Sequence, residues 1–435
     1  MTQLSPDSIL ALDAVALTGA VRAGTLSPVA VAEAYLERIA TRDETVRAWE
    51  YLSPGQVLEA ARALLARGPQ GALAGLPIAV KDVIATHDMP TGYGNVSYAG
   101  TRPVCDAPCV ALSRAADGLV LGKSVSTEFA MASPGKTRNP FDPARTPGGS
   151  SSGSCAAVGA GMALLGFGTQ TAGSVIRPAS YCGVVGYKPT HGLINTAEVK
   201  VLAQSLDTIG LLTRTVADAA LAASVLGRRP DLMPEGTVAG LRIGLFHTAP
   251  FDKAGPGTLA ALEHAHRALS GAGHRVSVLP VPDWFEHSHL AHHRVMGFEV
   301  TSALAFERLS PQVHMTDMTR DFLAAKAGVS AEDYDAALAF RDLHARKLAD
   351  LMADVDVLLA PAAPDVAPLG LGATGDPVFN TPWTLFRMPA ITVPALRWQG
   401  LPVGVQVIGA RHADRKTLAA AQAIEAALDY GWTAA

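Results

Sequence analysis

The chain contains 435 residues, 49% of them hydrophobic, and it carries a formal net charge of −4 at pH 7. This composition predicts a globular protein with a large core, built as one large α/β domain or as two smaller ones. The charge does not indicate a basic surface for binding nucleic acid or a membrane. The expected partner is therefore a small molecule, with no nucleic acid and no membrane.

The N-terminal segment and the cysteines both indicate the cytoplasm. No basic segment precedes a long apolar run at the start of the chain, so we expect no secretory signal. The cysteines lack the paired C-x-x-C spacing of zinc sites, and free thiols are ordinary in reducing compartments. We therefore expect no disulfide among Cys105, Cys109, Cys155 and Cys182.

The first element with a clear start signal is an amphipathic helix. Ser27 supplies an N-cap, and Pro28 follows at the first helical position. Val31, Tyr35 and Ile39 then recur every four residues, which places them on one face of a helix.

Six apolar segments farther along the chain predict β-strands. Several are apolar throughout, as in a sheet that is covered on both faces. Helical patterns lie between them, including residues 414–428, and the alternation predicts a layered α/β fold. The residues at about 226–350 are richer in charge and histidine, so we expect a helix-rich peripheral region there. The six strand segments are 76–84, 119–125, 241–246, 355–361, 389–395 and 402–409.

The stretch from Thr146 to Ile176 contains no acidic or basic residue and has a serine cluster at each end. Backbone rich in Gly and Ser can approach a substrate closely and direct its N–H groups at developing negative charge. A flexible linker is the alternative, but the apolar residues 155–167 need burial. They are also well short of the roughly 20 residues that a membrane span requires. We expect a helix entered through a serine loop, then a buried strand and a second Gly-rich turn that carry the chemistry.

Lys81 lies among apolar residues in the segment GLPIAVKDVIA. If it is buried, the charged ammonium is disfavoured, and a neutral lysine can act as a base. A surface lysine at a strand end is the alternative. A neutral lysine needs a hydroxyl to act on, and the two clusters supply residues 150–152 and Ser174.

The strings PGGSSSGSCAAVGAG and GTQTAGSVIRPASYCGVVGYKPT resemble the amidase signature enzymes, which hydrolyse amides with a Ser-cisSer-Lys triad. The segments LPIAVKD, SLDTIGLLTRTVADA and LPVGVQVIG resemble other blocks of that family, and the resemblance covers residues 10–428. It implies the amidase signature fold, a large twisted mixed β-sheet with helices on both faces, as a single domain over residues 1–435. It also implies hydrolysis of a carboxylic amide to an acid and ammonia or an amine, without cofactor or metal.

Position by position, the resemblance makes Ser174 the nucleophile, Ser150 the bridging serine after a cis peptide bond, and Lys81 the base. An acyl-enzyme forms, and water releases the acid. Thr169 and Ser152 match residues that support the triad by hydrogen bonding. The implied oxyanion hole consists of the backbone N–H groups of Thr171, Ala172, Gly173 and Ser174.

Two residues depart from the commonest family pattern. Gln170 replaces the usual acidic residue, and Ala172 replaces a glycine but keeps its amide N–H. The motifs look most like those of the malonamidase-like branch, in which the residue matching Arg177 can receive a substrate carboxylate through a bidentate pair. A structural arginine held in a salt bridge is an equal alternative.

Two other motifs in the chain suggest different nucleophiles. Residues 149–153 fit the G-x-S-x-G elbow of α/β-hydrolases, with Ser151 as nucleophile, but no strand pattern precedes them. Ser133 and Lys136 fit S-x-x-K, yet the Pro-Gly between them would break the helical turn that this motif requires.

Four histidines within a short segment could hold a metal ion, because two of them are one helical turn apart. No acidic ligand motif or cysteine pair accompanies them, so we expect a solvated helix face instead. The four are His287, His289, His292 and His293.

Three functions are compatible with these residues: a stand-alone amidase, the ammonia-generating subunit of a tRNA-dependent amidotransferase, and a silent binding protein that keeps the pocket. The complete triad favours the first, and the same triad can also act on esters and carbamates. The acyl group and the amine stay open, as does a homodimer. We expect the pocket walls in residues 89–100, in residues 128–136 and in the peripheral region.

Overall fold

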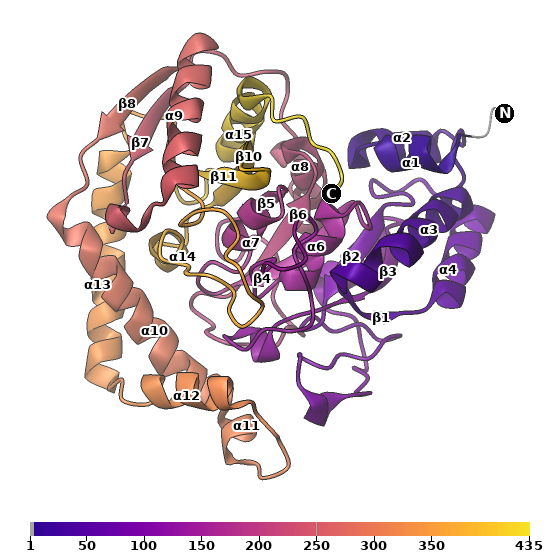
Figure 1. The fold of residues 1–435 in the computed structure, drawn as a ribbon, viewed down its shortest axis with the longest axis horizontal. Coiled ribbons are helices and arrows are strands. Elements are labelled where there is room, and N and C mark those ends of the chain that lie inside the picture. Colours follow the sequence, from indigo (N-terminus) through magenta and orange to yellow (C-terminus); the bar gives the residue numbers. More distant parts are fainter. Residues whose placement is uncertain (1–3, 249) are drawn as a thin grey trace.

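The computed structural model describes residues 4–248 and 250–435. Within these ranges, eleven strands form one continuous sheet at the centre of the molecule (Figure 1). The strands are β1 (Trp49–Leu52), β2 (Pro77–Lys81), β3 (Leu119–Ser124), β4 (Leu165–Gln170), β5 (Val185–Lys188), β6 (Thr208–Thr213), β7 (Arg242–Phe246), β8 (Arg275–Leu279), β9 (Val357–Pro361), β10 (Ala390–Trp398) and β11 (Leu401–Ile408).

The sheet is mixed, as predicted. Its order is β1-β3-β2-β4-β6-β5-β10-β11-β9-β7-β8. β2 is parallel to β3 and β4, and β7 is parallel to β8 and β9. The strands between these two parallel groups pair antiparallel, and so does β1 at the edge. The six predicted strand segments correspond to β2, β3, β7, β9, β10 and β11, and the buried strand after the serine loop is β4.

Helices cover both faces of the sheet. On β10, Thr392 donates its hydroxyl to Ile176 of α7, at 2.7 Å. The alternate residues Ile391 and Val393 belong instead to the hydrophobic cluster that contains residues of α8, α9 and α15. The helices are α1 (Pro6–Ala11), α2 (Ala14–Arg22), α3 (Pro28–Val46), α4 (Pro54–Arg67), α5 (Pro108–Ala115), α6 (Ser152–Gly159), α7 (Ile176–Tyr181), α8 (Val216–Leu226), α9 (Pro256–Gly271), α10 (His287–Ala303), α11 (Ala305–Leu309), α12 (Asp317–Lys326), α13 (Ala331–Leu351), α14 (Thr381–Leu385) and α15 (Asp414–Leu428).

One predicted helix begins at the expected residue, and another has the expected bounds. The Ser27 side chain caps α3 by accepting from the amide of Val29, and Val31, Tyr35 and Ile39 are buried. α15 covers the predicted residues Asp414–Leu428. Within the described ranges, no helix combines the length and the apolar character that crossing a bilayer requires.

The region expected to be helix-rich and peripheral has two parts. Its first part contributes β7 and β8 to one edge of the sheet, so this part belongs to the central layer. Its second part, residues 287–351, is helical and projects from the sheet as an arm formed by α10, α11, α12 and α13 (Figure 1). We call residues 287–351 the helical arm.

The helical arm is attached to the two loops that we expected to form pocket walls. Tyr98 donates its hydroxyl to Glu307 of the arm, at 2.7 Å, and Thr316 of the arm donates its hydroxyl to Glu128, at 2.6 Å. Phe129 packs in a hydrophobic cluster that also contains arm residues. Segments 89–100 and 128–136 and the arm therefore meet on one side of the sheet.

Candidate active site

Lys81 is the last residue of β2 and is fully buried, with 0% exposure. Its Nζ lies 2.7 Å from Ser150 Oγ and 2.8 Å from Thr169 Oγ1. Burial lowers the pKa of Lys81 from its ordinary value of 10.5 to about 7, because an ammonium ion loses its hydration in this environment. The alternative of a surface lysine is wrong, and a large fraction of this side chain is neutral near pH 7.

Ser150 follows a cis peptide bond from Gly149, as the family resemblance implies. Its carbonyl oxygen accepts from the amide of Thr127, at 3.2 Å. A side chain at position 149 would not fit, because a Cβ there would lie 2.7 Å from a methyl group of Thr374. These contacts hold the backbone at Ser150, and the hydroxyl is directed at Lys81 Nζ, 2.7 Å away.

Ser174 lies in the loop between β4 and α7 and is partly exposed. Each end of this loop is tied to the Lys81–Ser150 pair. Thr169, at the end of β4, contacts Lys81, and Arg177, in the first turn of α7, donates to the carbonyl of Gly149 at 2.7 Å. Among the described residues, no hydrogen bond involves the Ser174 hydroxyl, so no protein partner holds it in another direction.

The carbonyl groups of this loop are bound by side chains from other elements. His292 of α10 lies with Nε2 2.8 Å from the Thr171 carbonyl, and Thr384 of α14 donates its hydroxyl to the Ala172 carbonyl at 2.8 Å. Burial lowers the pKa of His292 to about 4, so the ring is neutral, and Nε2 carries the proton because a carbonyl can only accept. Sequence reasoning missed both roles, since the partners are more than 100 residues apart.

Gln170 connects the loop to α7 and α14. Its Oε1 accepts from the backbone amides of Val175, at 2.9 Å, and Ile176, at 3.1 Å. Its Nε2 donates to Thr384 Oγ1 at 3.0 Å, and Thr384 in turn donates to the loop. A carboxylate at position 170 could accept the two amides but could not donate to Thr384. Gln170, which replaces the usual acidic residue, therefore has a specific acceptor in Thr384.

Arg177 is 4% exposed, and its bonds go to neutral groups. Besides Gly149, it donates from Nε to the Thr374 carbonyl, at 2.9 Å, and from Nη2 to the Thr374 hydroxyl, at 3.2 Å. Nη1 is buried and has no partner among the described residues. Among the described residues no carboxylate pairs with the guanidinium, so its structural contacts are hydrogen bonds to neutral groups and not the salt bridge of the alternative. What the arginine holds is the backbone before Ser150.

The other serines of the first cluster are engaged in backbone bonds. Ser151 accepts from the Thr169 amide, at 3.2 Å, and lies 3.3 Å from the Thr169 carbonyl. Ser152 begins α6 and donates to the Val125 carbonyl, at 3.2 Å. No strand leads into residues 149–153, so the context of a nucleophile elbow is missing. Lys136 of the S-x-x-K motif pairs with Glu50, at 3.1 Å.

The four histidines of α10 differ in exposure: His287 and His293 are exposed, as expected of a solvated helix face, whereas His289 is half-buried and His292 is buried. His292 is 3% exposed and binds the loop carbonyl described above. Nδ1 of His289 lies 3.0 Å from the Thr381 hydroxyl, and Nδ1 of His293 lies 2.6 Å from Lys326 Nζ. His289 and His292 thus contact α14 and the loop between β4 and α7, because the start of α10 packs beside α14.

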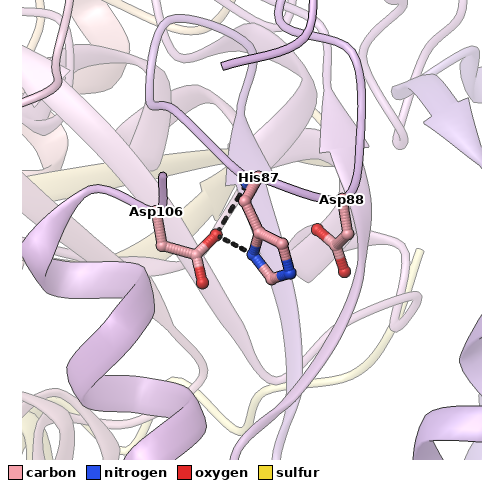
Figure 2. Close-up of side chains that lie close together, drawn as sticks. All are labelled: His87, Asp88 and Asp106. Atoms are coloured by element: carbon pink, nitrogen blue, oxygen red, sulfur yellow. Dashed lines mark hydrogen bonds and ion pairs between the residues drawn. The ribbon is translucent and has the colours of Figure 1, made fainter. Parts of the chain in front are cut away.

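Among the described residues, one group has the geometry to hold a metal ion, and it lies outside the helical arm. Figure 2 shows His87 between Asp88 and Asp106, with its backbone and ring nitrogens directed at Asp106. Arg114 already pairs with both carboxylates of this group, with Nη2 2.7 Å from Asp88 and Nε 3.1 Å from Asp106. An arginine between two carboxylates provides the positive charge that a cation would otherwise supply. The group is therefore better explained as an ion-pair network.

Comparison with known proteins adds to this geometry. The amidase family model matches residues 30–418, which is most of the chain. The chain belongs to the amidase family. This amidase is 34% identical to a glutamyl-tRNA(Gln) amidotransferase subunit of Salinispora arenicola, with 97% of this chain and 98% of the relative covered. The predicted family is confirmed, and the protein is an enzyme that hydrolyses amide C–N bonds.

Solved structures agree with this amidase in fold. A crystal structure of an amidase is 30% identical, with a TM-score of 0.85 and coverage of 95% of this chain and 99% of that chain. The peptide amidase of Stenotrophomonas maltophilia is 28% identical, with a TM-score of 0.80 and coverage of 97% of each chain. The predicted amidase signature fold is confirmed.

Proposed function

We propose that this amidase cleaves a small carboxylic amide to an acid and ammonia or an amine, through an acyl-enzyme on Ser174. The observation that carries the proposal is the contact of 2.7 Å between the fully buried Lys81 and Ser150, beside the loop that holds Ser174. A base with a pKa of about 7 is matched to proton transfer at neutral pH.

The relay starts from neutral Lys81. Its amine donates to Thr169 and accepts the proton of Ser150, while Ser150 accepts the proton of Ser174. The Oγ of Ser174 bonds to the amide carbon, and the tetrahedral intermediate then breaks its C–N bond. The proton returns from Lys81 through Ser150 to the leaving nitrogen. Water uses the same relay to cleave the acyl ester, which releases the acid and restores Ser174.

The N–H groups of Ala172, Gly173 and Ser174 are proposed to hold the oxyanion, and the preceding amide of Thr171 extends this set. Within the described chain, these first three amides donate to no protein acceptor. In a trans peptide, the N–H points away from the carbonyl of the preceding residue. Side chains that bind the carbonyls of Thr171 and Ala172 therefore turn the amides of Ala172 and Gly173 to the opposite side. Donors fixed in this way stabilise charge without reorganisation.

An assay of the purified protein alone on simple amides, with detection of ammonia and amines, tests this proposal directly. We expect turnover by the wild type and by Ser151→Ala, and none by Ser174→Ala with an unchanged fold. Turnover by Ser174→Ala together with an inactive Ser151→Ala would contradict the assignment. Esters and carbamates are assayed in the same way, and the rates on the three substrate classes show which leaving group the enzyme prefers.

A second function has support from the Salinispora relative, which is named as part of an amidotransferase and aligns over nearly its whole length. On this alternative, the same site releases ammonia from glutamine for a partner protein. The two functions differ in a simple test, because a stand-alone amidase turns over amides without partner proteins. Activity on glutamine that appears only when amidotransferase partners are added would favour the alternative.

A further inference from the structure

A cavity of about 470 Å³ lies beside the nucleophile loop, between the helical arm and residues 376–381. Ala172 forms part of its wall. Because consecutive Cα atoms are 3.8 Å apart and each residue extends the chain by at most about 3.6 Å, the Cα atoms of Ala172 and Ser174 are no more than about 7 Å apart. A group bound against Ala172 is therefore only a few bonds from a carbonyl carbon at Ser174.

Lys326, the last residue of α12, lines this cavity and is 8% exposed. Its Nζ lies 2.6 Å from His293 Nδ1, so a neutral His293 accepts from the ammonium and keeps it in place. Among the described residues, no carboxylate pairs with Lys326. Burial lowers its pKa to about 8, which still leaves the side chain mostly protonated at pH 7.

The other charged groups of the cavity cancel each other. The acidic residue in its lining, Asp376, forms an ion pair with Lys253 at 2.8 Å. The remaining wall is partly apolar and includes Met296, Phe322 and Val378. A buried cation that faces a cavity without a counter-ion is unfavourable, and an anion in the cavity would relieve that cost.

We propose that this cavity binds a carboxylate of the substrate, with Lys326 as the recognising cation and His293 as the residue that orients it. The inference rests on the proposed amide hydrolysis and names its substrate class: amides whose acyl or amine part ends in a carboxylate. Lys326 fits this task better than Arg177, whose guanidinium already donates to Gly149 and Thr374.

The experiment compares two amides of equal length, the monoamide of a short dicarboxylic acid and the neutral amide with a methyl group in place of the carboxylate. We expect the wild type to prefer the acidic amide. Lys326→Met should lower kcat/KM for the acidic amide by about 10- to 100-fold, mainly through KM, and leave the neutral amide within about twofold. Lys326→Arg, which keeps the charge, should keep the preference.

Lys347 supplies a matched control, because it is an exposed lysine of the same helical arm, outside the cavity. Lys347→Met should leave both substrates unchanged. Equal activity of the wild type on the two amides, or equal losses in Lys326→Met, would overturn the subsite.

A binding measurement separates this subsite from the proposed hydrolysis. Calorimetry of the dicarboxylic monoamide with Ser174→Ala should show binding that the added Lys326→Met change removes, and no change of affinity in the double variant would overturn the subsite. Neutral amide turnover that depends on Ser174, without any preference for the acidic amide, would overturn the subsite alone. Absence of Ser174-dependent turnover on every amide, with binding retained, would contradict the proposed hydrolysis alone.

Discussion

Lys81 and Thr169 lie at the ends of buried central strands, whereas His292 and Lys326 come from the helical arm, which projects from the sheet (Figure 1). The strands place Lys81 2.8 Å from Thr169, and Lys81 in turn lies 2.7 Å from Ser150 of the serine loop. The arm contributes one bond to the loop that carries the proposed nucleophile, and a cation in the neighbouring cavity. On the proposed mechanism, the sheet positions the proton relay, whereas the arm helps to hold the loop and selects the substrate.

The largest expected effect is that of replacing Lys81, the proposed base at the end of β2. Lys81→Met should lower kcat by about 10³-fold or more, because it removes the proposed base. The variant should be at least as stable as the wild type. Below about pH 7 both folded and unfolded Lys81 are charged, and the folded state carries the whole cost of burying the ammonium.

The stability difference should shrink as the pH rises from about 7 toward 10.5, because the folded protein has then lost the proton that the unfolded chain still binds. Thermal unfolding at several pH values, with kcat measured on the same samples, checks both statements. An active Lys81→Met variant would place the base elsewhere.

The pH profile of activity should also depend on Lys81. With a folded pKa of about 7, Lys81 becomes neutral as the pH rises, so kcat/KM should increase through about pH 7 and then level. A profile measured between pH 5 and 9 shows this limb directly. The same limb in a residually active Lys81 variant would assign the ionisation to another group.

Substitutions of Thr384 in α14 and of His292 in the helical arm should have a smaller effect, on kcat alone. Thr384→Val and His292→Phe each remove a side chain that holds a loop carbonyl, so kcat should fall by about 10- to 100-fold while KM changes by less than about twofold. Thr384→Ser keeps the hydroxyl and should restore most of kcat. A loss in KM, or no rescue by serine, would indicate a packing role instead.

Arg177→Gln should have an intermediate to small effect that is equal for charged and neutral substrates, because the guanidinium holds the Gly149 carbonyl. Its melting temperature should fall as well, since a buried network of three bonds is lost. A selective loss on the dicarboxylic monoamide would instead assign the substrate carboxylate to Arg177, through its unpartnered Nη1.

The smallest expected effect is none at all. A chelator should leave activity unchanged, and so should His87→Ala, because Arg114 already pairs with Asp88 and Asp106. Inhibition by the chelator that added zinc reverses would contradict this interpretation of the histidines.

Much of the fold could be predicted from local patterns. Runs of apolar residues identified β2, β3, β7, β9, β10 and β11, and cap residues located α3. Four strands were missed: β1 and β5 have four residues each, β8 is largely exposed at the sheet edge, and β6 is a buried strand of six residues. Such segments become strands through pairing with neighbours, which a local pattern does not record.

The site was predictable only in part, for a similar reason. Motif residues identified Lys81, Ser150 and Ser174 as candidates, and the structure brings Lys81 and Ser150 into contact. The residues that hold the loop, His292 and Thr384, lie 121 and 212 residues from their partners. Histidine spacing on α10 indicated only a helix face, because its neighbour depends on how the helical arm packs.

Mapping of the covalent intermediate tests the central claim most directly. The protein is treated with a reactive acylating or phosphonylating probe, or quenched during amide turnover, then digested and analysed by mass spectrometry. The account predicts one adduct on Ser174, formed much more slowly in Lys81→Met and at the normal rate in Ser151→Ala. An adduct on Ser150 or Ser151, or a rate of labelling that does not depend on Lys81, would contradict it.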